Sequence, residues 1–326
     1  MTDTDATRRA GDRDPGAGDG AGRAAARPAR AADPGADGAP PVGASGVGWW
    51  AATDHRRIAL GFLVWISGLL LLGILLAVYL QLKVTADGAD AAVVSRLLTY
   101  HGLLTVFLVI VPAIPSILGH LMLPRQLRAA DMALPRFSQW SLRLYVLGSL
   151  LSLGSLALLP VATGWTLVTP LSLQSGSALL LLACGIALVA TSWFLTGVNI
   201  LITVHRHVSP ERGFFGLPPF SWALYLTAYI LVVSGVLLAI VIVYLGAAAA
   251  TGKGLFGAPD ADPLYWQHYF WFVTTPAAFF AVIPALGVMA DVVAGISRKA
   301  LAGQRVVAGA LTALLVVGFV SWGVRL

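Results

Sequence analysis

The chain is poor in cysteine, in charge and in the motifs of soluble enzymes. It has a single cysteine, Cys184, in 326 residues, which excludes an intrachain disulfide framework and any iron–sulfur or zinc cluster held by several thiolates. Charged residues make up 11% of the chain, whereas soluble domains carry roughly 25%. It has neither a glycine-rich phosphate loop nor a candidate Ser–His–Asp set. These absences argue against a soluble protein, and any metal must use ligands other than cysteine clusters.

Aromatic residues are missing from the first 48 positions, which are dominated by Ala, Gly, Pro, Asp and Arg. A segment of this composition cannot bury enough apolar surface to fold. It also lacks the short apolar core of a secretory signal. We therefore expect residues 1–48 to form a disordered cytoplasmic tail, followed by a membrane domain over residues 49–326.

Long apolar stretches dominate the chain from Ile58 onward. Each is near or above the roughly 20 residues that a helix needs to cross the hydrocarbon core of a bilayer. Backbone groups in lipid must bond within their own segment, and these stretches lack the alternation of barrel strands. The sequence predicts an all-α, polytopic membrane helix bundle. Its seven transmembrane helices are expected near residues 58–82, 98–122, 140–162, 177–204, 219–247, 265–290 and 306–324.

The basic residues predict how this bundle is oriented. With the N-terminus inside, ten Lys and Arg fall on inner segments and four on outer ones, which is the asymmetry of membrane proteins. The inner residues are Arg56, Arg57, Arg125, Arg128, Arg136, Arg206, Arg212, Arg298, Lys299 and Arg305, and the outer ones are Lys83, Arg96, Lys253 and Arg325. Orientation in a bacterial-type inner (cytoplasmic) membrane therefore explains the net charge of +6 better than a nucleic-acid partner does.

Ionisable groups in or near the spans are the main functional candidates, because each such group costs a few kcal/mol or more at membrane depth. His101 is predicted roughly 6 Å inside the outer boundary of the second span. Its imidazole can ligate haem iron, with the small Gly102 beside it leaving room for a flat macrocycle; the alternative is a plain polar residue at a helix end. The full set is His101, His120, Asp131, Arg143, His205, His207, His268 and Asp291.

Several short motifs also follow one another in a fixed order. They are Thr53-Asp54-His55-Arg56-Arg57-Ile58, His101-Gly102, Asp131-Met132-Ala133-Leu134-Pro135-Arg136, Thr163-Gly164-Trp165-Thr166 and Gln267-His268-Tyr269-Phe270-Trp271-Phe272. Together they resemble subunit I of the haem-copper terminal oxidases, the cytochrome c oxidase family. The resemblance covers residues 53–326 and implies a domain similar to the first seven helices, the N-terminal half, of that subunit.

The chain departs from this pattern at the copper-ligand positions. Helix six of the family carries Gly-His-Pro-Glu-Val-Tyr, in which the His binds copper and the Glu ends a proton pathway. Here the aligned residues are Thr274-Thr275-Pro276-Ala277-Ala278-Phe279, so Thr275 stands at the copper-ligand position. Helix seven of the family ends Trp-Ala-His-His, with two more copper ligands, where this chain has Trp322-Gly323-Val324-Arg325. We therefore expect no copper and no independent oxidase activity.

The resemblance assigns roles to three other positions. His101 falls on an axial ligand of the family's low-spin haem, so the opposite ligand must come from elsewhere. Asp131 falls on the carboxylate at the mouth of a proton channel, and His120 replaces an Asn of that channel. The alternative is that Asp131 is a solvated charge in a loop without a role in proton transfer. It is open because Ala277 stands where the family has the Glu that ends the proton pathway.

Two main hypotheses follow. The chain is a respiratory electron-transport module that holds one low-spin haem with a partner chain, or it is a cofactor-free structural or assembly subunit of an oxidase. Half of a split active oxidase is a third, less favoured hypothesis. Since the family's later helices are expected beyond the C-terminus, the expected partner is a separately encoded oxidase-like subunit in a hetero-oligomer, with a homodimer as the weaker option. We expect small and polar positions to pack against it, namely Ser116, Gly119, Thr196, Gly197, Asn199 and Ser234.

Overall fold

The computed structural model describes residues 49–85, 90–158, 161–211, 213–258, 261–299, 301 and 303–321. The chain divides into two units, Met1–Ser45 and Gly46–Leu326, and all the described residues belong to the second. The predicted disordered tail, residues 1–48, lies outside them. Every regular element among the described residues is helical, which confirms the all-α class.

The helices follow one another along the chain with short connections. The α-helices are α1 (His55–Thr85), α2 (Ala91–Leu103), α3 (Gly119–Leu127), α4 (Pro135–Leu158), α5 (Ser177–His207), α6 (Pro219–Thr251), α7 (Pro263–Ala277), α8 (Phe279–Ser297) and α9 (Gln304–Val320). Two π-helical stretches, η2 (Leu104–Ile110) and η3 (Ala113–Leu118), lie between α2 and α3. Short 3₁₀ helices are η1 (Trp49–Ala51), η4 (Leu171–Ser175) and η5 (Phe214–Gly216).

Five helical segments among the described residues are long and apolar enough to cross a membrane. They are His55–Thr85, Ala91–Leu127, Ser177–His207, Pro219–Thr251 and Pro263–Ser297. The helices α4 and α9 overlap the other two predicted stretches, and α9 is a shorter apolar helix of 17 residues. The structure thus supports a multi-pass membrane bundle with five candidate spans, while the count of seven stays a prediction.

Small residues let neighbouring helices of this bundle approach closely. A Cβ atom added to Gly148 would lie 2.6 Å from the Gly185 carbonyl oxygen, where α4 meets α5. One added to Gly197 would lie 2.9 Å from the Ala228 carbonyl oxygen, where α5 meets α6. Helices in membranes commonly use small residues in this way, because packing rather than the hydrophobic effect holds them together.

The expectation that six small or polar positions face a partner chain is therefore wrong. Four of them are at most 2% exposed within the chain itself, namely Ser116, Thr196, Asn199 and Ser234. The other two, Gly119 and Gly197, also pack against helices of this chain. For the four positions on α5 and α6, the reason is that α5 packs between α4 and α6. Ser116 and Gly119 are covered because η3 packs against α1, and α3 packs against α5 and α6.

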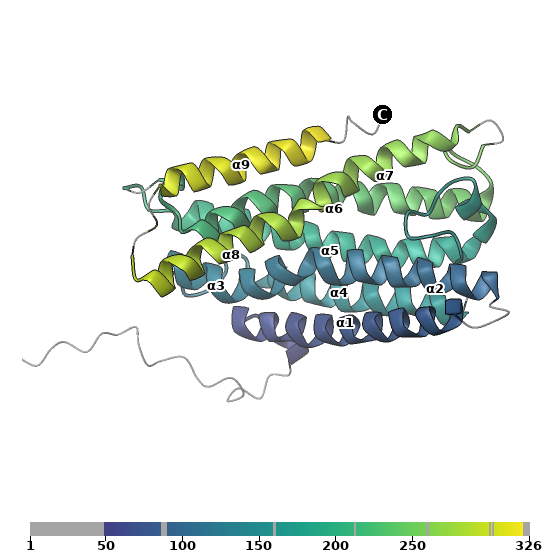
Figure 1. Ribbon diagram of the computed structural model, residues 1–326, viewed down its shortest axis with the longest axis horizontal. Helices are drawn as coiled ribbons and strands as arrows, with labels where there is room; N and C mark the ends of the chain where they lie inside the picture. The colour runs from purple at the N-terminus through teal and green to yellow at the C-terminus, as the bar shows by residue number, and fades with distance from the viewer. Residues whose placement is uncertain are drawn as a thin grey trace, which may run out of the picture. The chain divides into compact units, whose positions relative to one another are not determined.

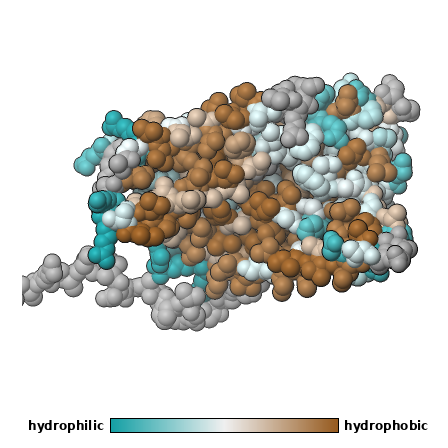
Figure 2. Space-filling view, viewed as in Figure 1, coloured by the Kyte–Doolittle hydropathy of each residue, from teal (hydrophilic) through white to brown (hydrophobic). Residues whose placement is uncertain are grey.

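The connections gather at two ends of the bundle (Figure 1). The His55 end holds the start of α1 and the connections after α3, α5 and α8. The Trp165 end holds the connections after α4 and α6, where the Trp266 indole donates to the Thr166 carbonyl oxygen at 2.8 Å. Hydrophobic residues cover the middle of the face in Figure 2, and hydrophilic residues gather mainly toward its ends.

Basic residues separate between these two ends as the sequence predicts. Those at the His55 end are Arg56, Arg57, Arg125, Arg128, Arg136, Arg206, Arg298, Lys299 and Arg305, against Lys83, Arg96 and Lys253 at the Trp165 end. Arg212 and Arg325 lie outside the described residues. That the His55 end faces the cytoplasm follows from the positive-inside rule and stays a prediction.

Candidate functional site

His101 lies half-buried near the end of α2, facing α1. Its Nδ1 atom lies 3.1 Å from the Gly73 carbonyl oxygen. A carbonyl oxygen can only accept, so Nδ1 carries the proton and the lone pair sits on Nε2. No hydrogen-bond partner for Nε2 is found among the described residues. Histidines that ligate metals usually have this arrangement, with the distal nitrogen donating to a carbonyl group. The side chain therefore fits an axial haem ligand.

Gly102 does not provide the space that the sequence suggests. A Cβ atom added there would lie 2.6 Å from Cβ of Trp165 and 2.9 Å from its ring. The room beside this glycine is filled by a tryptophan of the connection after α4, so its small size serves the packing of that connection against α2. A macrocycle bound at His101 must approach from another direction.

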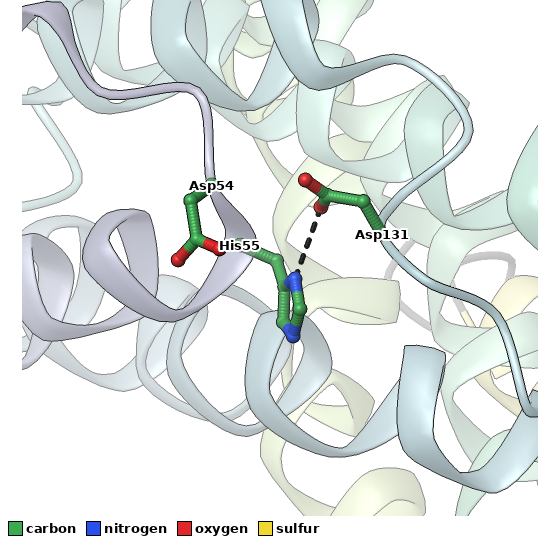
Figure 3. A group of neighbouring side chains, drawn as sticks. All are labelled: Asp54, His55 and Asp131. Carbon is green, nitrogen blue, oxygen red and sulfur yellow. Dashed lines mark hydrogen bonds and ion pairs between the residues drawn. The ribbon is translucent and has the colours of Figure 1, made fainter. Parts of the chain in front are cut away.

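Asp131 lies at the His55 end, in the connection between α3 and α4, and is paired with a residue of α1. Its Oδ1 atom lies 3.1 Å from Nδ1 of His55, as Figure 3 shows, and accepts from the Met132 amide at 2.7 Å. His55 is 5% exposed. Sequence reasoning quoted His55 within a motif but assigned it no role, since nothing in the local pattern shows which distant carboxylate it meets.

Asp54 completes a small group around His55 (Figure 3). Its carboxylate accepts hydrogen bonds from the amides of Arg56 and Arg57, at 2.9 and 3.1 Å, and so caps the start of α1. The possible ligand atoms of Asp54, His55 and Asp131 lie within 4.8 Å of one another. In the described part of the chain, this is the one group of three or more acidic, histidine or cysteine side chains arranged closely enough to share a cation.

His120 is fully buried, and both of its ring nitrogens have hydrogen-bond partners. Its Nδ1 atom donates to the Ser116 carbonyl oxygen at 2.8 Å, and its Nε2 atom lies 3.1 Å from the Ser138 hydroxyl. The ring stacks on Phe62 with centroids 5.8 Å apart. Among the described residues no hydrogen bond joins His120 to Asp131. The structure thus places both residues at the His55 end but does not connect them directly.

Asn199 of α5 extends this polar network. Its amide group donates to the Ser138 hydroxyl at 2.8 Å and to the Leu134 carbonyl oxygen at 3.0 Å, and its Oδ1 atom accepts from the Leu134 amide at 2.9 Å. Together with Thr203, whose hydroxyl accepts from the Ala133 amide at 3.0 Å, it fastens the connection after α3 to α5. We refer to His120, Ser138 and Asn199 as the inner network.

Aromatic side chains occupy the bundle beyond this network. Trp193 follows Ser192 on α5, is 2% exposed, and stacks on Phe107 with centroids 6.0 Å apart. It also contacts Phe280 of α8, at 5.9 Å. Phe107 in turn contacts Trp165, at 6.3 Å. A continuous set of rings therefore runs from α5 to the Trp165 end.

The helix break between α7 and α8 lies beside a cavity of about 1160 Å³. Thr275 and Phe279 line it, together with the rings of Trp165 and Trp271. The hydroxyl of Thr275 is buried and has no hydrogen-bond partner among the described residues. Among the described residues of the lining there is no histidine, cysteine or carboxylate, which are the side chains that hold transition metals.

The match to a known family covers most of the chain. The family model described as "Cytochrome C and Quinol oxidase polypeptide I" matches residues 57–324. The chain belongs to this family. It is 29% identical over 308 residues to a putative cytochrome c oxidase subunit 1-beta of Streptomyces avermitilis. The match covers 92% of this chain and 53% of the relative.

Other members of the oxidase subunit I family match a similar share of the chain. Cytochrome c oxidase subunit 1 of Thermostichus vulcanus is 31% identical over 275 residues, covering 82% of this chain and 50% of the relative. A heme-copper oxidase subunit I+III of Aeropyrum pernix is 31% identical over 294 residues. The match covers 84% of this chain and 34% of the relative. The chain spans about half the length of the first two of these oxidase subunits.

The remaining candidates from the sequence lie apart from His101. His205 contacts the Tyr225 hydroxyl at 3.1 Å, and His207 has its Nδ1 atom 3.0 Å from the Thr203 carbonyl oxygen, both at the His55 end. Asp291 of α8 accepts from the Gln126 amide at 2.6 Å, and Arg143 donates to the Trp50 carbonyl oxygen. His268 lies on α7 beside α6. Val324 and Arg325, which the sequence resemblance places at the other two copper-ligand positions, lie outside the described residues.

Proposed function

We propose that this oxidase subunit I homologue is an electron-transport module of a respiratory complex that holds one low-spin haem through His101 and does not reduce oxygen by itself. The observation that carries the proposal is the hydrogen bond between His101 Nδ1 and the Gly73 carbonyl oxygen at 3.1 Å. It fixes the tautomer and orients Nε2 for a metal. When bound, the haem would supply a one-electron couple.

The residues at the family's copper position support a module without oxygen chemistry. Thr275 offers a neutral hydroxyl where the family has imidazole, and Phe279 has no hydroxyl where the family has tyrosine. Neither side chain supplies a ligand that copper prefers or a phenolic hydrogen. Copper is therefore not proposed for this chain, and independent oxidase activity is not expected.

A proton-conducting role for Asp131 and His120 stays a prediction, and the contacts favour a structural role for both. Both ring nitrogens of His120 are bonded within the inner network. The rings of Trp193, Phe107 and Phe280 lie beyond it. Asp131 pairs with His55 and so ties the connection after α3 to α1.

A partner chain would supply the second protein ligand of the haem, because a low-spin haem would take one more besides His101. The relative named subunit I+III shows that subunit I can be joined to a further subunit in that protein. A separately encoded oxidase-like subunit in a bacterial-type inner membrane is therefore the partner we propose. A cofactor-free structural or assembly subunit is the competing function, and half of a split active oxidase is a weaker one.

The decisive experiment is a haem spectrum of the complex purified from its native membrane. His101→Ala should remove one low-spin haem signal from the reduced-minus-oxidised spectrum while the subunits stay together. His207→Ala is the matched control, because its Nδ1 atom also faces a backbone carbonyl oxygen, at 3.0 Å, and it should leave the spectrum unchanged. An unchanged spectrum in His101→Ala would leave only the structural role.

A further inference from the structure

Arg143 lies on a face of α4 that the rest of the chain leaves uncovered. Trp140 precedes it by three residues, and Leu147 and Leu150 follow it by four and seven, so the four side chains share one face of the helix. Trp140, Leu147 and Leu150 are 51%, 53% and 50% exposed. Because α4 overlaps one of the predicted membrane stretches, we expect this face to lie against lipid. We refer to these four residues as the Arg143 stripe.

One edge of the Arg143 guanidinium is fixed by the segment that precedes α1. Its Nε and Nη2 atoms donate to the Trp50 carbonyl oxygen at 3.1 and 3.0 Å. Its Cζ atom lies 5.1 Å from the ring centroid of Trp140 and 5.7 Å from that of Trp50, which is within the range of cation–π contacts. The carbonyl group and the two indole rings together hold the guanidinium in one orientation.

The other edge of this guanidinium lacks an anion. A guanidinium has five N–H donors, and two of them serve the Trp50 carbonyl oxygen. For the remaining three, on Nη1 and Nη2, the described residues provide neither an acceptor nor a carboxylate that pairs with Arg143. Arg143 lies eight residues after Pro135, where α4 begins, which places it roughly 12 Å along the helix. Charges at such positions in membrane proteins are normally paired.

The surface beyond Arg143 indicates what kind of anion fits. The paired N–H groups of a guanidinium match two oxygens of a phosphate group. Leu147 and Leu150 continue the same face as an apolar surface, and a Cβ atom added to Gly154, four residues further, would meet no atom within 4 Å. An acyl chain can lie along this uncovered surface, whereas an inorganic phosphate ion would use only the guanidinium.

We propose that the Arg143 stripe binds an anionic phospholipid at the His55 end of the bundle. Two phosphate oxygens accept from Nη1 and Nη2 of Arg143, and an acyl chain lies along Leu147 and Leu150. Arg136 is exposed seven residues earlier on the same face, so a second cation lies beside the headgroup and favours a net negative lipid. The proposal does not depend on whether His101 holds a haem.

The test is a lipid titration of the purified full chain in detergent, followed by native mass spectrometry. One probe is dioleoylphosphatidylglycerol, and the matched probe is dioleoylglycerol, which has the same acyl chains and no phosphate group. The spectra should show saturable binding of the phospholipid at a tightest site of one equivalent, and weaker binding of dioleoylglycerol. Inorganic phosphate at the same concentration should not displace the phospholipid, because it has no acyl chain.

Four variants locate the binding. Arg143→Gln should weaken phospholipid binding about 10-fold and leave dioleoylglycerol unaffected. Arg206→Gln is the matched control, because Arg206 also donates to a backbone carbonyl oxygen at the His55 end, that of Ala133 at 3.2 Å, and lies outside the stripe. Leu147→Glu places a carboxylate one turn from Arg143, where it can pair with the guanidinium and should prevent phosphate binding. Leu147→Gln is its uncharged control and should retain the affinity.

Three results would overturn the proposal. Equal affinity for the two probes would show that only acyl chains are bound, and displacement by inorganic phosphate would show a site for a soluble anion. Equal losses in Arg143→Gln and Arg206→Gln would show a general attraction to the basic end. Circular dichroism of each variant identifies any loss caused by misfolding, and Leu147→Glu gives an independent answer because it retains Arg143. The haem spectrum of His101→Ala is a separate readout, so either proposal can fail alone.

Discussion

In the inner network the buried side chains of His120, Ser138 and Asn199 all have hydrogen-bond partners, whereas in the cavity beside α7 the Thr275 hydroxyl has none among the described residues. The sequence resemblance assigns family positions to residues in both regions, His120 in the first and Thr275 in the second. The comparison shows that one region keeps a saturated polar network, which orders the connection after α3, while the other contains a buried hydroxyl without a partner among the described residues.

The largest effect is expected from Asn199→Ala, which removes three hydrogen bonds of the inner network. Both backbone groups of Leu134 and the Ser138 hydroxyl lose a partner, so we expect the free energy of unfolding to fall by about 3 kcal/mol. Unfolding in mixed micelles titrated with sodium dodecyl sulfate measures this change. Thr191→Ala on the same helix is the control, since its hydroxyl donates only to the Ala187 carbonyl oxygen. A loss below about 1 kcal/mol would contradict the importance of this network.

Ser138→Ala should have an intermediate effect. The change removes the partner of His120 Nε2 and one of the two acceptors of the Asn199 amide group, which we expect to lower the free energy of unfolding by about 1–2 kcal/mol. Ser141→Ala tests whether any serine on this face of α4 would do the same, because the Ser141 hydroxyl donates only within its own helix, to the Ser138 carbonyl oxygen. Equal losses in the two variants would show that the network adds nothing.

A smaller effect is expected from Asp131→Asn. The Asp131 side chain is 31% exposed, and ion pairs with this degree of solvent access contribute at most about 1 kcal/mol. Asparagine also keeps an oxygen that can accept from the Met132 amide. Thermal unfolding in detergent at low and high salt would measure the ionic contribution of the pair to stability. Asp131→Ala removes the hydrogen-bond acceptor as well and should be less stable than Asp131→Asn. If Asp131→Asn unfolds the chain, the pairing with His55 has been underestimated.

The smallest effect on stability is expected from Thr275→Val. Replacing a buried hydroxyl that has no partner by a methyl group of similar shape should leave the free energy of unfolding unchanged or raise it by up to about 1 kcal/mol. The same detergent titration measures it beside Ser138→Ala. A clear loss of stability in Thr275→Val would mean that the hydroxyl is bonded, and the contrast between the two regions would then disappear.

Much of the architecture could be predicted from the sequence, because the length of an apolar stretch determines whether it can cross a bilayer. Helices overlap each of the seven predicted stretches, and five segments among the described residues meet the requirements for a span. The separation of basic residues between two ends followed from loop composition alone. The family assignment followed from ordered motifs and is confirmed by the match over residues 57–324.

What the sequence could not predict is which helix faces meet. In lipid the outer surface of a bundle is as apolar as its interior, so α5 carries no polar stripe that marks its exposed side. The expectation for Gly197 and Asn199 was wrong for this reason. The partners of Gly102 and His55 come from residues 63 and 76 positions away, Trp165 and Asp131, and no local pattern reports contacts over such separations.

The π-helical stretches between α2 and α3 should allow the second candidate span to lose a residue without disrupting its helix. Each wide turn accommodates one residue more than an α-helical turn, so a single deletion within Leu104–Ile110 can be absorbed if the stretch tightens to α-helix. His101 and His120 would then keep their orientations at opposite ends of the segment. The same deletion within α5 would turn every later side chain by about 100°, and a comparison of the folding yields of the two deletions would measure how much length this span can lose.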